Sequence, residues 1–488
     1  MKTSTSIRKS IMYQVFYEVL VILAPLITAP IVSRALGPEC SGIYSYTYSI
    51  AGYFVLFCML GIKNHGSRII AEKSENQDEL NQTFSNLLVL HIFISFIVFL
   101  AYIIYVFAIS SSSIRLFALL QGMYVLSALF DISWFYIGIE QFKITVIRNV
   151  VIKLLTILLI VLLVKTSSDL WKYVAIMAGG ILVSQIWLWF HLNKYVKIVK
   201  PDKDGILENM KPMMVLFIPV IAVSLYKMMD KIMIGWVNTT ELGYYEYADK
   251  IISVPMSVIE AIGVVMLPRI SKLLANGGKE ESKHLIQTSM KLNMILAIAM
   301  AFGVASISQE FAPVFFGQEY ISCAALMIGL SITIPFLSFA NVLRKQFMIP
   351  MKMDRAYTIA VFCGAAVNLV CNLIFIPKFF ARGALIGTIL AEVIVCIMHI
   401  YACKNYLPIK EYVKNLLPYL VAGLCMYLIV RFTAEQFTAS VLGLVVEVIV
   451  GGITYLLLAM CILLIQKDEI IFQVWHRLKR QLKKIITG

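Results

Sequence analysis

The chain is a succession of long apolar stretches separated by short polar segments. Each stretch is about 20 or more mostly apolar residues long, which is what an α-helix needs to cross a hydrocarbon core roughly 30 Å thick. Strands of a membrane barrel would be shorter and would alternate apolar and polar positions. The sequence therefore predicts an all-α, polytopic membrane protein. The fourteen predicted transmembrane helices lie at 11–33, 43–62, 84–108, 114–139, 144–164, 172–193, 212–237, 244–266, 287–308, 321–342, 357–376, 383–404, 414–432 and 441–465.

The polar connections carry basic residues very unevenly. Of the 42 Lys and Arg residues, 32 lie on the side of the predicted membrane that holds both termini, seven lie on the other side and three lie within predicted spans. Basic loops stay on the cytoplasmic side of a membrane. Both termini are therefore predicted to be cytoplasmic, and every external connection is short.

Composition supports this class of protein. The chain is 60% hydrophobic and 14% charged, against about 45–50% and about 25% in an average soluble protein. This excludes a soluble enzyme, a disordered chain and a secreted disulfide scaffold. In a soluble protein a net charge of +14 would indicate nucleic-acid binding. Here it follows from basic cytoplasmic loops held near anionic lipid, so membrane lipids are the predicted partner and nucleic acid is not.

Motifs that would signal catalysis, metal or nucleotide binding are missing from the sequence. The nine cysteines form no Cys-x-x-Cys pair, so neither a zinc site nor a disulfide framework is indicated. No nucleotide-binding Gly-x-x-x-x-Gly-Lys-Ser/Thr loop occurs, and neither does His-Glu-x-x-His or Gly-x-Ser-x-Gly. We therefore expect no cofactor, no metal site and no enzymatic activity.

An internal repeat emerges when the chain is shifted by 201 residues. Gly42, Tyr44 and Tyr46 then fall on Gly243, Tyr245 and Tyr247, and Arg68-Ile69 falls on Arg269-Ile270. Chance matching of apolar residues is the alternative. A shift of six spans preserves orientation, so the repeat is predicted to be parallel, with two lobes related by a pseudo-twofold axis along the membrane normal. The predicted parts are a six-helix N-terminal lobe (1–200), a six-helix C-terminal lobe (201–408) and two appended helices with a basic cytoplasmic tail (409–488).

Two predicted helices carry charged residues where lipid would surround them. Each charge at the bilayer centre costs about 2.5–3.5 kcal/mol, so these groups must be paired or in contact with water. One interpretation is a salt-bridged hairpin that holds two helices together, and the other is a water-filled cavity that accepts an anion. The two clusters, which lie at similar depth before and after the same turn, are Lys227, Asp230 and Lys231, and Glu246, Asp249 and Lys250.

Further polar groups stand alone within spans. A lone carboxylate in a helix bundle is a candidate for coupling transport to protons or sodium ions, and an interhelical hydrogen bond is the alternative. Glu18, Asp131 and Glu260 are the candidate coupling carboxylates. The other isolated groups are Glu392, His399 and Glu447.

Several runs of residues resemble a known family. They are PIVSRALGPECSGIY at 30–44, DKIMIG at 230–235, ELGYYEYADKI at 241–251 and MLPRIS at 266–271. These runs resemble the polysaccharide transporters of the MOP (MATE-like) superfamily, and most closely the Wzx-type oligosaccharide flippases. The resemblance covers the whole chain in the number and grouping of spans.

The resemblance implies a flippase that moves an undecaprenyl-pyrophosphate-linked oligosaccharide across the bacterial cytoplasmic membrane by alternating access. The product would be O-antigen, capsule or exopolysaccharide, and a polysaccharide polymerase and chain-length proteins are the implied partners. Lys227, Lys231 and Lys250 would attract the pyrophosphate, while Arg68 and Arg269 would guard the cytoplasmic mouth. Asp230, Glu246 and Asp249 would pair with the lysines when the cavity is empty.

Three other functions stay open at this point. A MATE-like small-molecule antiporter shares the fold but typically has twelve spans, and a lipid II flippase usually has more arginine in its cavity. A membrane polysaccharide polymerase typically has a large external loop and no two-lobe repeat, and this chain has short external loops and a repeat.

Overall fold

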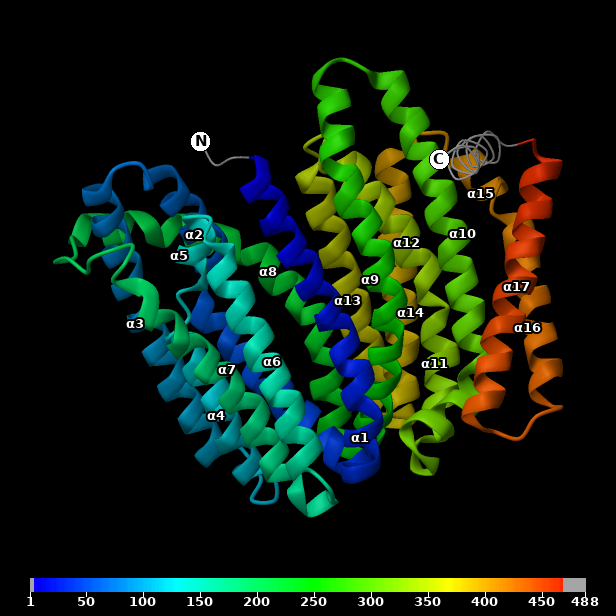
Figure 1. Ribbon diagram of the computed structural model, residues 1–488, viewed down its shortest axis with the longest axis horizontal. Coiled ribbons are helices and arrows are strands. Elements are labelled where there is room, and N and C mark those ends of the chain that lie inside the picture. Colours follow the sequence, from blue (N-terminus) through cyan, green and yellow to red (C-terminus); the bar gives the residue numbers. More distant parts are fainter. Residues whose placement is uncertain (1–3, 468–488) are drawn as a thin grey trace, which may run out of the picture. The chain divides into compact units, whose positions relative to one another are not determined.

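The computed structural model describes residues 4–467, and the side chains of 24–467 except those of 219, 222, 223 and 225–227. All regular elements in this part of the chain are helical, without a single strand (Figure 1). Contacts between residues divide the chain into two compact units. Unit 1 is Met1–Glu246 with Ile376–Ala381, and unit 2 is Tyr247–Phe375 with Arg382–Gly488. Each unit is described by itself.

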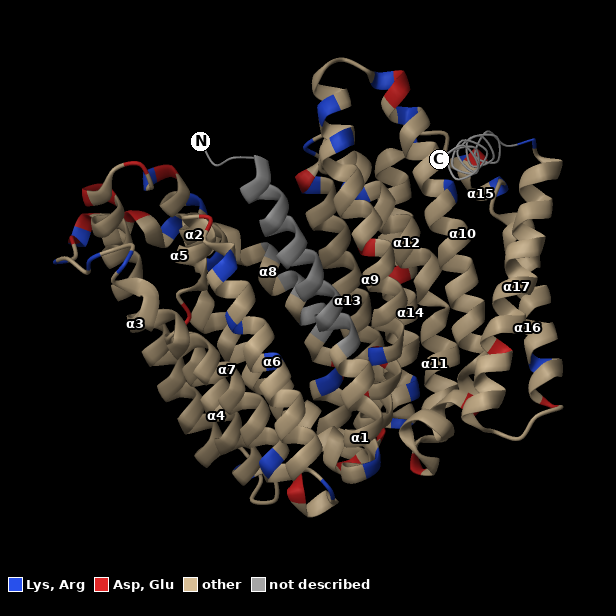
Figure 2. Ribbon diagram, in the orientation of Figure 1, with Lys and Arg blue, Asp and Glu red and all other residues tan. Residues whose placement is uncertain are grey.

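The predicted transmembrane helices are confirmed as helices. Among the residues whose side chains are described, twelve helical segments are long and apolar enough to cross a membrane. The first of these, Ala24–Lys73, contains the predicted span 43–62 and part of 11–33. The predicted span 212–237 lies in α8 (Lys203–Val237). Figure 2 shows α3 and α4 without charged residues between their ends, as lipid contact requires.

Unit 1 begins with α1 (Ser4–Met59), in which two predicted spans follow one another. At about 1.5 Å per residue, 56 helical residues would be far longer than the bilayer is thick. The backbone leaves helical geometry at Gly37, with φ 72° and ψ 174°, and Pro38 follows. The break between the first two spans thus depends on a glycine in a left-handed conformation. The remaining elements are α2 (Ile62–Lys73), α3 (Gln77–Ala108), α4 (Arg115–Leu129), α5 (Ser133–Gly138), α6 (Phe142–Leu163), η1 (Ser167–Asp169), α7 (Leu170–Leu192), α8 and the first turns of α9 (Thr239–Ala275).

Two short helices of unit 1 were not predicted. α2 lies in the expected loop after the second span and buries Ile62 and Ile70. α5 continues the predicted span 114–139 beyond a break after α4, and it buries Trp134 and Phe135. The four side chains belong to one apolar core cluster with residues of α3 and α7, so α2 and α5 cover one end of the unit.

The connection between α7 and α8 is tied to α3. Three side chains of α3 accept backbone N–H groups of this segment: Asn81 from Lys197 at 2.9 Å, Ser85 from Val199 at 2.9 Å and Asn86 from Asp202 at 2.8 Å. The N-terminal part of α8 is tied to α2 by a contact of 2.6 Å between His65 Nε2 and Asn209 Oδ1. These bonds keep α8 in unit 1, which therefore extends beyond residue 200. The boundary of the repeat need not coincide with the boundary of this compact unit. The division into 1–200, 201–408 and 409–488 remains a prediction.

The second half of α1 and the start of α9 cross at two glycines. A Cβ atom on Gly42 would lie 1.7 Å from the carbonyl oxygen of Thr239, and one on Gly243 would lie 2.0 Å from the carbonyl oxygen of Pro38. Backbone atoms occupy the space that any side chain would need. The 201-residue shift also aligns Gly42 with Gly243. Two residues related by a twofold axis can touch only close to that axis, so under the predicted repeat this crossing lies at the axis.

Unit 2 packs its helices around two apolar clusters. One joins α9, α10, α12, η4 and α14 around Ile270, Met290 and Leu343. The other joins α10, α16 and α17 around Met426 and Tyr455. The elements after α9 are α10 (Lys279–Phe311), η2 (Ala312–Phe316), η3 (Gln318–Tyr320), α11 (Cys323–Ser331), α12 (Thr333–Leu343), η4 (Arg344–Met348), α13 (Asp354–Phe379), α14 (Ala381–Cys403), α15 (Ile409–Lys414), α16 (Leu417–Ala434) and α17 (Val441–Ile465).

Replacing Gly243 by alanine tests the crossing of α1 and α9. Inside a helix this change normally stabilises by up to about 1 kcal/mol. At Gly243 the new methyl group must displace backbone, and overpacking of this kind costs about 1–3 kcal/mol or more. We expect Gly243→Ala to lower the midpoint of thermal unfolding of the purified protein in detergent.

The matched control is Gly452→Ala in α17, because nothing lies within 4 Å of a Cβ placed there. That variant should unfold at or above the parental temperature. Equal midpoints for the two variants would contradict the close crossing.

Candidate functional site

The hairpin of α8 and α9 brings Lys231 and Glu246, one residue from each predicted charge cluster, to one level. Asn238 lies between the two helices, and its side chain accepts the backbone N–H of Glu241 at 3.1 Å, which caps the start of α9. Lys231 lies seven residues before Asn238, and Glu246 lies eight residues after it. At about 1.5 Å per residue the two side chains begin about 10–12 Å from the turn, so they face each other across the hairpin.

Lys231 and Glu246 form an ion pair within unit 1. Lys231 Nζ lies 2.8 Å from Glu246 Oε2, and the two side chains are 19% and 13% exposed. Ser45 of α1 donates its hydroxyl to the same carboxylate oxygen at 2.7 Å. Three helices therefore meet at one oxygen atom, and the carboxylate has a neutral donor in addition to its cation.

Asp230 lies beside this pair in α8 and is 4% exposed. Its Oδ2 accepts the hydroxyl of Tyr245 of α9 at 3.2 Å. A buried carboxylate needs such donors, because removing it from water is costly. Asp230 and Lys231 are adjacent in α8, and their partners Tyr245 and Glu246 are adjacent in α9.

Close helix packing holds α8 against the second half of α1. A Cβ atom on Gly52 would lie 2.2 Å from Met228 Cε, and one on Gly235 would lie 2.5 Å from Tyr46 Cδ2. Each helix therefore supplies one glycine where the other presents a large side chain. The two contacts lie three and four residues from Lys231, so the backbone that carries the lysine is positioned on both sides.

The charged residues of α9 beyond Glu246 belong to unit 2. Lys250 Nζ lies 4.6 Å from the ring centroid of Tyr247, which is within the range of a cation–π interaction. Tyr247 is 1% exposed and packs against Phe316 and Tyr320, with ring centroids 4.8 and 4.9 Å away. The lysine is thus placed over an aromatic cluster, and Asp249 is partly buried beside it.

The remaining predicted residues have varied surroundings. Arg68 is exposed and pairs with Glu72 of the same helix at 3.0 Å, and Arg269 is exposed. Asp131 accepts the backbone N–H of Ser133 at 2.8 Å, which is the role of a turn residue at the start of α5.

Glu260 is exposed on unit 2, and its backbone carbonyl accepts Lys345 Nζ at 3.2 Å. The side chains of Glu18 and Lys227 lie outside the described residues. In the part of the chain that is described, no three His, Cys, Asp or Glu side chains gather as a set of metal ligands.

Sequence reasoning missed Ser45, because a serine within an apolar span has no chemical signature of its own. The 201-residue shift contains the signal that could have found it. Under this shift Ser45 falls on Glu246, and the structure places these two side chains in contact. A polar pair related by the repeat was therefore a candidate for direct contact near the axis.

Sequence comparison identifies related transporters. A protein of Shigella dysenteriae named "Putative O-antigen transporter" is 21% identical over 385 residues, which cover 78% of this chain and 96% of that protein. A protein of Haloferax volcanii named "Probable low-salt glycan biosynthesis flippase Agl15" is 22% identical over 250 residues, which cover 51% of this chain and 52% of that protein.

The fold is shared with a solved flippase structure. The lipid II flippase MurJ in an inward closed conformation superposes with a TM-score of 0.75 at 14% identity, over 93% of this chain and 98% of that one. This likeness shows that the two chains share one fold.

Two family models match the chain, and their matches overlap at residues 216–274. The MatE model matches residues 216–374, which include the α8–α9 hairpin. The model described as polysaccharide biosynthesis protein matches residues 7–274, more than half of the chain, and includes Ser45, Lys231 and Glu246. The chain belongs to the polysaccharide biosynthesis protein family.

Proposed function

We propose that the protein is a flippase that carries a lipid-linked oligosaccharide across the cytoplasmic membrane of a bacterium, for the synthesis of a surface polysaccharide. The observation that carries this proposal is the similarity to the Shigella dysenteriae protein named "Putative O-antigen transporter" over 96% of that protein's length. Family membership and the fold support it. The cargo crosses without chemical change, so the protein is not an enzyme, and both of its termini are cytoplasmic.

Lys231 is the residue that we propose to bind the substrate's pyrophosphate. Glu246 neutralises the lysine in the empty protein at 2.8 Å. A pyrophosphate offers more negative charge and more acceptor oxygens than one carboxylate, and charge-assisted hydrogen bonds are stronger than neutral ones. When the lysine turns to the pyrophosphate, Glu246 keeps the hydroxyl donor of Ser45. The exchange therefore leaves no bare carboxylate behind.

The other charged residues have supporting roles in this proposal. Lys227 and Lys250 add to the positive field that attracts the head group, and Asp230 and Asp249 balance it when no substrate is bound. Arg68 and Arg269 attract the anionic head group at the cytoplasmic mouth. Glu18, Asp131 and Glu260 remain candidates for proton or sodium coupling, and a polymerase and chain-length proteins receive the product. Alternating access moves the head group, while the polyprenyl tail stays in lipid.

One observation favours a second function. The MatE family model matches residues 216–374, so a small-molecule antiporter is the competing proposal. Proteoliposomes distinguish the two functions when they contain an undecaprenyl-pyrophosphate-linked oligosaccharide and are assayed for external accessibility of the glycan. Protein-dependent exposure of the glycan supports the flippase, whereas uptake of a cationic dye without glycan exposure supports the antiporter.

The topology predicts where reporter enzymes become active. The segment after α7 and the C-terminal tail are both strongly basic, and such segments stay on the cytoplasmic side. Fusions after Lys200 and after Gly488 should both give a cytoplasmic signal. A periplasmic signal from either fusion would overturn the topology.

Substitution of Lys231 tests its role in cells whose own gene has been deleted. Lys231→Ala should reduce surface polysaccharide by about tenfold or more, equivalent to roughly 1.4 kcal/mol of lost interaction with the head group. Lys231→Arg should retain most of the export, because it keeps the charge and hydrogen-bond donors. Protein abundance is measured beside the polysaccharide, and Lys143→Ala, an exposed lysine of the same unit, serves as the control.

The double variant Lys231→Glu with Glu246→Lys separates binding from structural support. A purely structural ion pair predicts that both abundance and export recover when the charges are exchanged. A binding lysine predicts that abundance recovers but export does not, because the ammonium group now starts from α9. If Lys231→Ala accumulates normally and exports at the parental level, Lys231 has neither role.

A further inference from the structure

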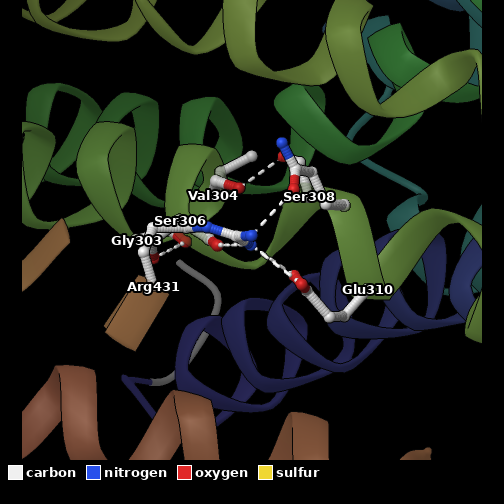
Figure 3. Close-up of polar contacts among 7 residues, drawn as sticks. Gly303, Val304, Ser306, Ser308, Glu310 and Arg431 are labelled. Atoms are coloured by element: carbon white, nitrogen blue, oxygen red, sulfur yellow. Dashed lines mark hydrogen bonds and ion pairs between the residues drawn. The ribbon is translucent and has the colours of Figure 1, made fainter. Parts of the chain in front are cut away.

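One arginine and two carboxyl groups lie on the three helices α10, α16 and α17, which pack together in unit 2. Arg431 of α16 reaches α10, as Figure 3 shows, where its Nη1 donates to both carboxylate oxygens of Glu310 at 2.9 and 2.7 Å. Its Nη2 donates to Gln309 Oε1 at 2.7 Å, and Nη1 also contacts the carbonyl oxygen of Ser306 at 3.3 Å. The bonds of the guanidinium group therefore all run to α10.

The second carboxyl group belongs to Glu447, on the buried stripe of α17. Glu447 is 2% exposed, and its Oε2 has no hydrogen-bond partner among the described residues. One turn further on, a Cβ on Gly451 would lie 2.9 Å from Cγ2 of Val430, the residue that precedes Arg431. The stripe, which repeats every fourth residue and faces the neighbouring helices, consists of Gly443, Glu447, Gly451, Tyr455 and Ala459.

The charges that face Glu447 come from two neighbouring helices. Arg431 of α16 directly follows Val430, which packs against α17 one turn from Glu447, and Glu310 of α10 is bonded to Arg431. On α17 itself, the hydroxyl of Tyr455 is two turns away and donates to the carbonyl of Ile295 at 2.8 Å. Arg431 is thus the cation available to both carboxyl groups, and in this structure it is paired with Glu310. A buried carboxylate without a cation is strongly disfavoured.

We propose that Glu447, Arg431 and Glu310 form a proton-binding site. Glu447 carries the proton while Arg431 is paired with Glu310, as in this structure. When the O–H bond of Glu447 breaks, the proton passes to solvent water and the new carboxylate draws the guanidinium group from Glu310. Arg431 and Glu310 are 23% and 15% exposed and lie in the last turns of α16 and α10, so the site is at the ends of these helices, where it can exchange a proton with water.

The exchange changes which helices are joined. The protonated state bonds α16 to α10, and the deprotonated state bonds α16 to α17. Proton loss therefore loosens α10 from the two C-terminal helices. The physiological role, coupling a proton to transport, rests on the proposed flippase function, whereas proton binding at Glu447 does not.

Infrared difference spectroscopy of the purified full-length protein in lipid nanodiscs tests the binding site. The parental protein should have a C=O stretching band of a protonated carboxyl group that disappears when the pH is raised. Glu447→Gln should lack this band. Glu310→Gln should also lack it at neutral pH, although Glu447 is still present, because Arg431 is then free to pair with Glu447.

The control is Glu435→Gln, an exposed carboxylate in the same connection between α16 and α17, which should retain the band. Thermal unfolding of each variant establishes that it is folded, and Gln is isosteric with Glu. A band that persists in full in Glu447→Gln would overturn the proton site. A band that persists in Glu310→Gln would overturn the exchange of Arg431.

Proteoliposomes with an imposed pH gradient test the coupling. Transport of the lipid-linked oligosaccharide by the parental protein should depend on the direction of the gradient, and Glu447→Gln should lose this dependence while still transporting. A Glu447→Gln protein that responds like the parent would overturn the coupling. If even the parental protein transports no oligosaccharide, the proposed function fails, and the infrared band still decides whether Glu447 binds a proton.

Discussion

The absence of any hydrogen-bond partner in the hydrocarbon core of a membrane is the constraint on which the rest of this structure depends. Backbone groups that cross this layer must be satisfied within their own helix, which accounts for a chain whose regular elements are all helical in its described part. The same constraint acts on charged side chains. Lys231 lies against Glu246, and Arg431 lies against Glu310. Each pair joins two helices, so satisfying the charges also fixes which helices are neighbours.

Helices in lipid gain little from apolar burial, because lipid tails are as apolar as leucine, and they associate through close packing and polar contacts. Unit 1 combines close packing and a polar contact where α1 crosses α9. Gly42 and Gly243 let α1 and α9 approach until backbone touches backbone, and three residues further along each helix Ser45 bonds Glu246. The close approach is what allows a side chain as short as serine to reach the carboxylate. Packing and polar chemistry are thus two parts of one contact.

The positions of the membrane-spanning helices were predictable from the sequence, since the length of each apolar stretch follows directly from the thickness of the membrane. The charged clusters of α8 and α9 were predictable because lipid makes them conspicuous. Three things were not predictable. α2 and α5 are stabilised by a core shared with distant helices. The segment after α7 is held by amide and hydroxyl groups of α3 that look like ordinary polar residues. Glu447 was visible as an isolated carboxyl group, but its relation to Arg431 and Glu310 depends on how α10, α16 and α17 pack.

The number of donors around each carboxylate distinguishes a permanent ion pair from one that can exchange. A structural pair is stable when each charge depends on the other, because removing one partner leaves an uncompensated charge. Glu246 has both Lys231 and Ser45, so it retains a donor when the lysine leaves. Arg431 has Glu310, Gln309 and a backbone carbonyl on α10, while Glu447 on the adjacent α17 has one buried oxygen, Oε2, without a hydrogen-bond partner in the described part. Glu246 therefore keeps a hydrogen-bond donor when Lys231 leaves it. Arg431 has a second carboxyl group, that of Glu447, to which it can move. Both arrangements lower the cost of exchange, which a protein that alternates between two states requires.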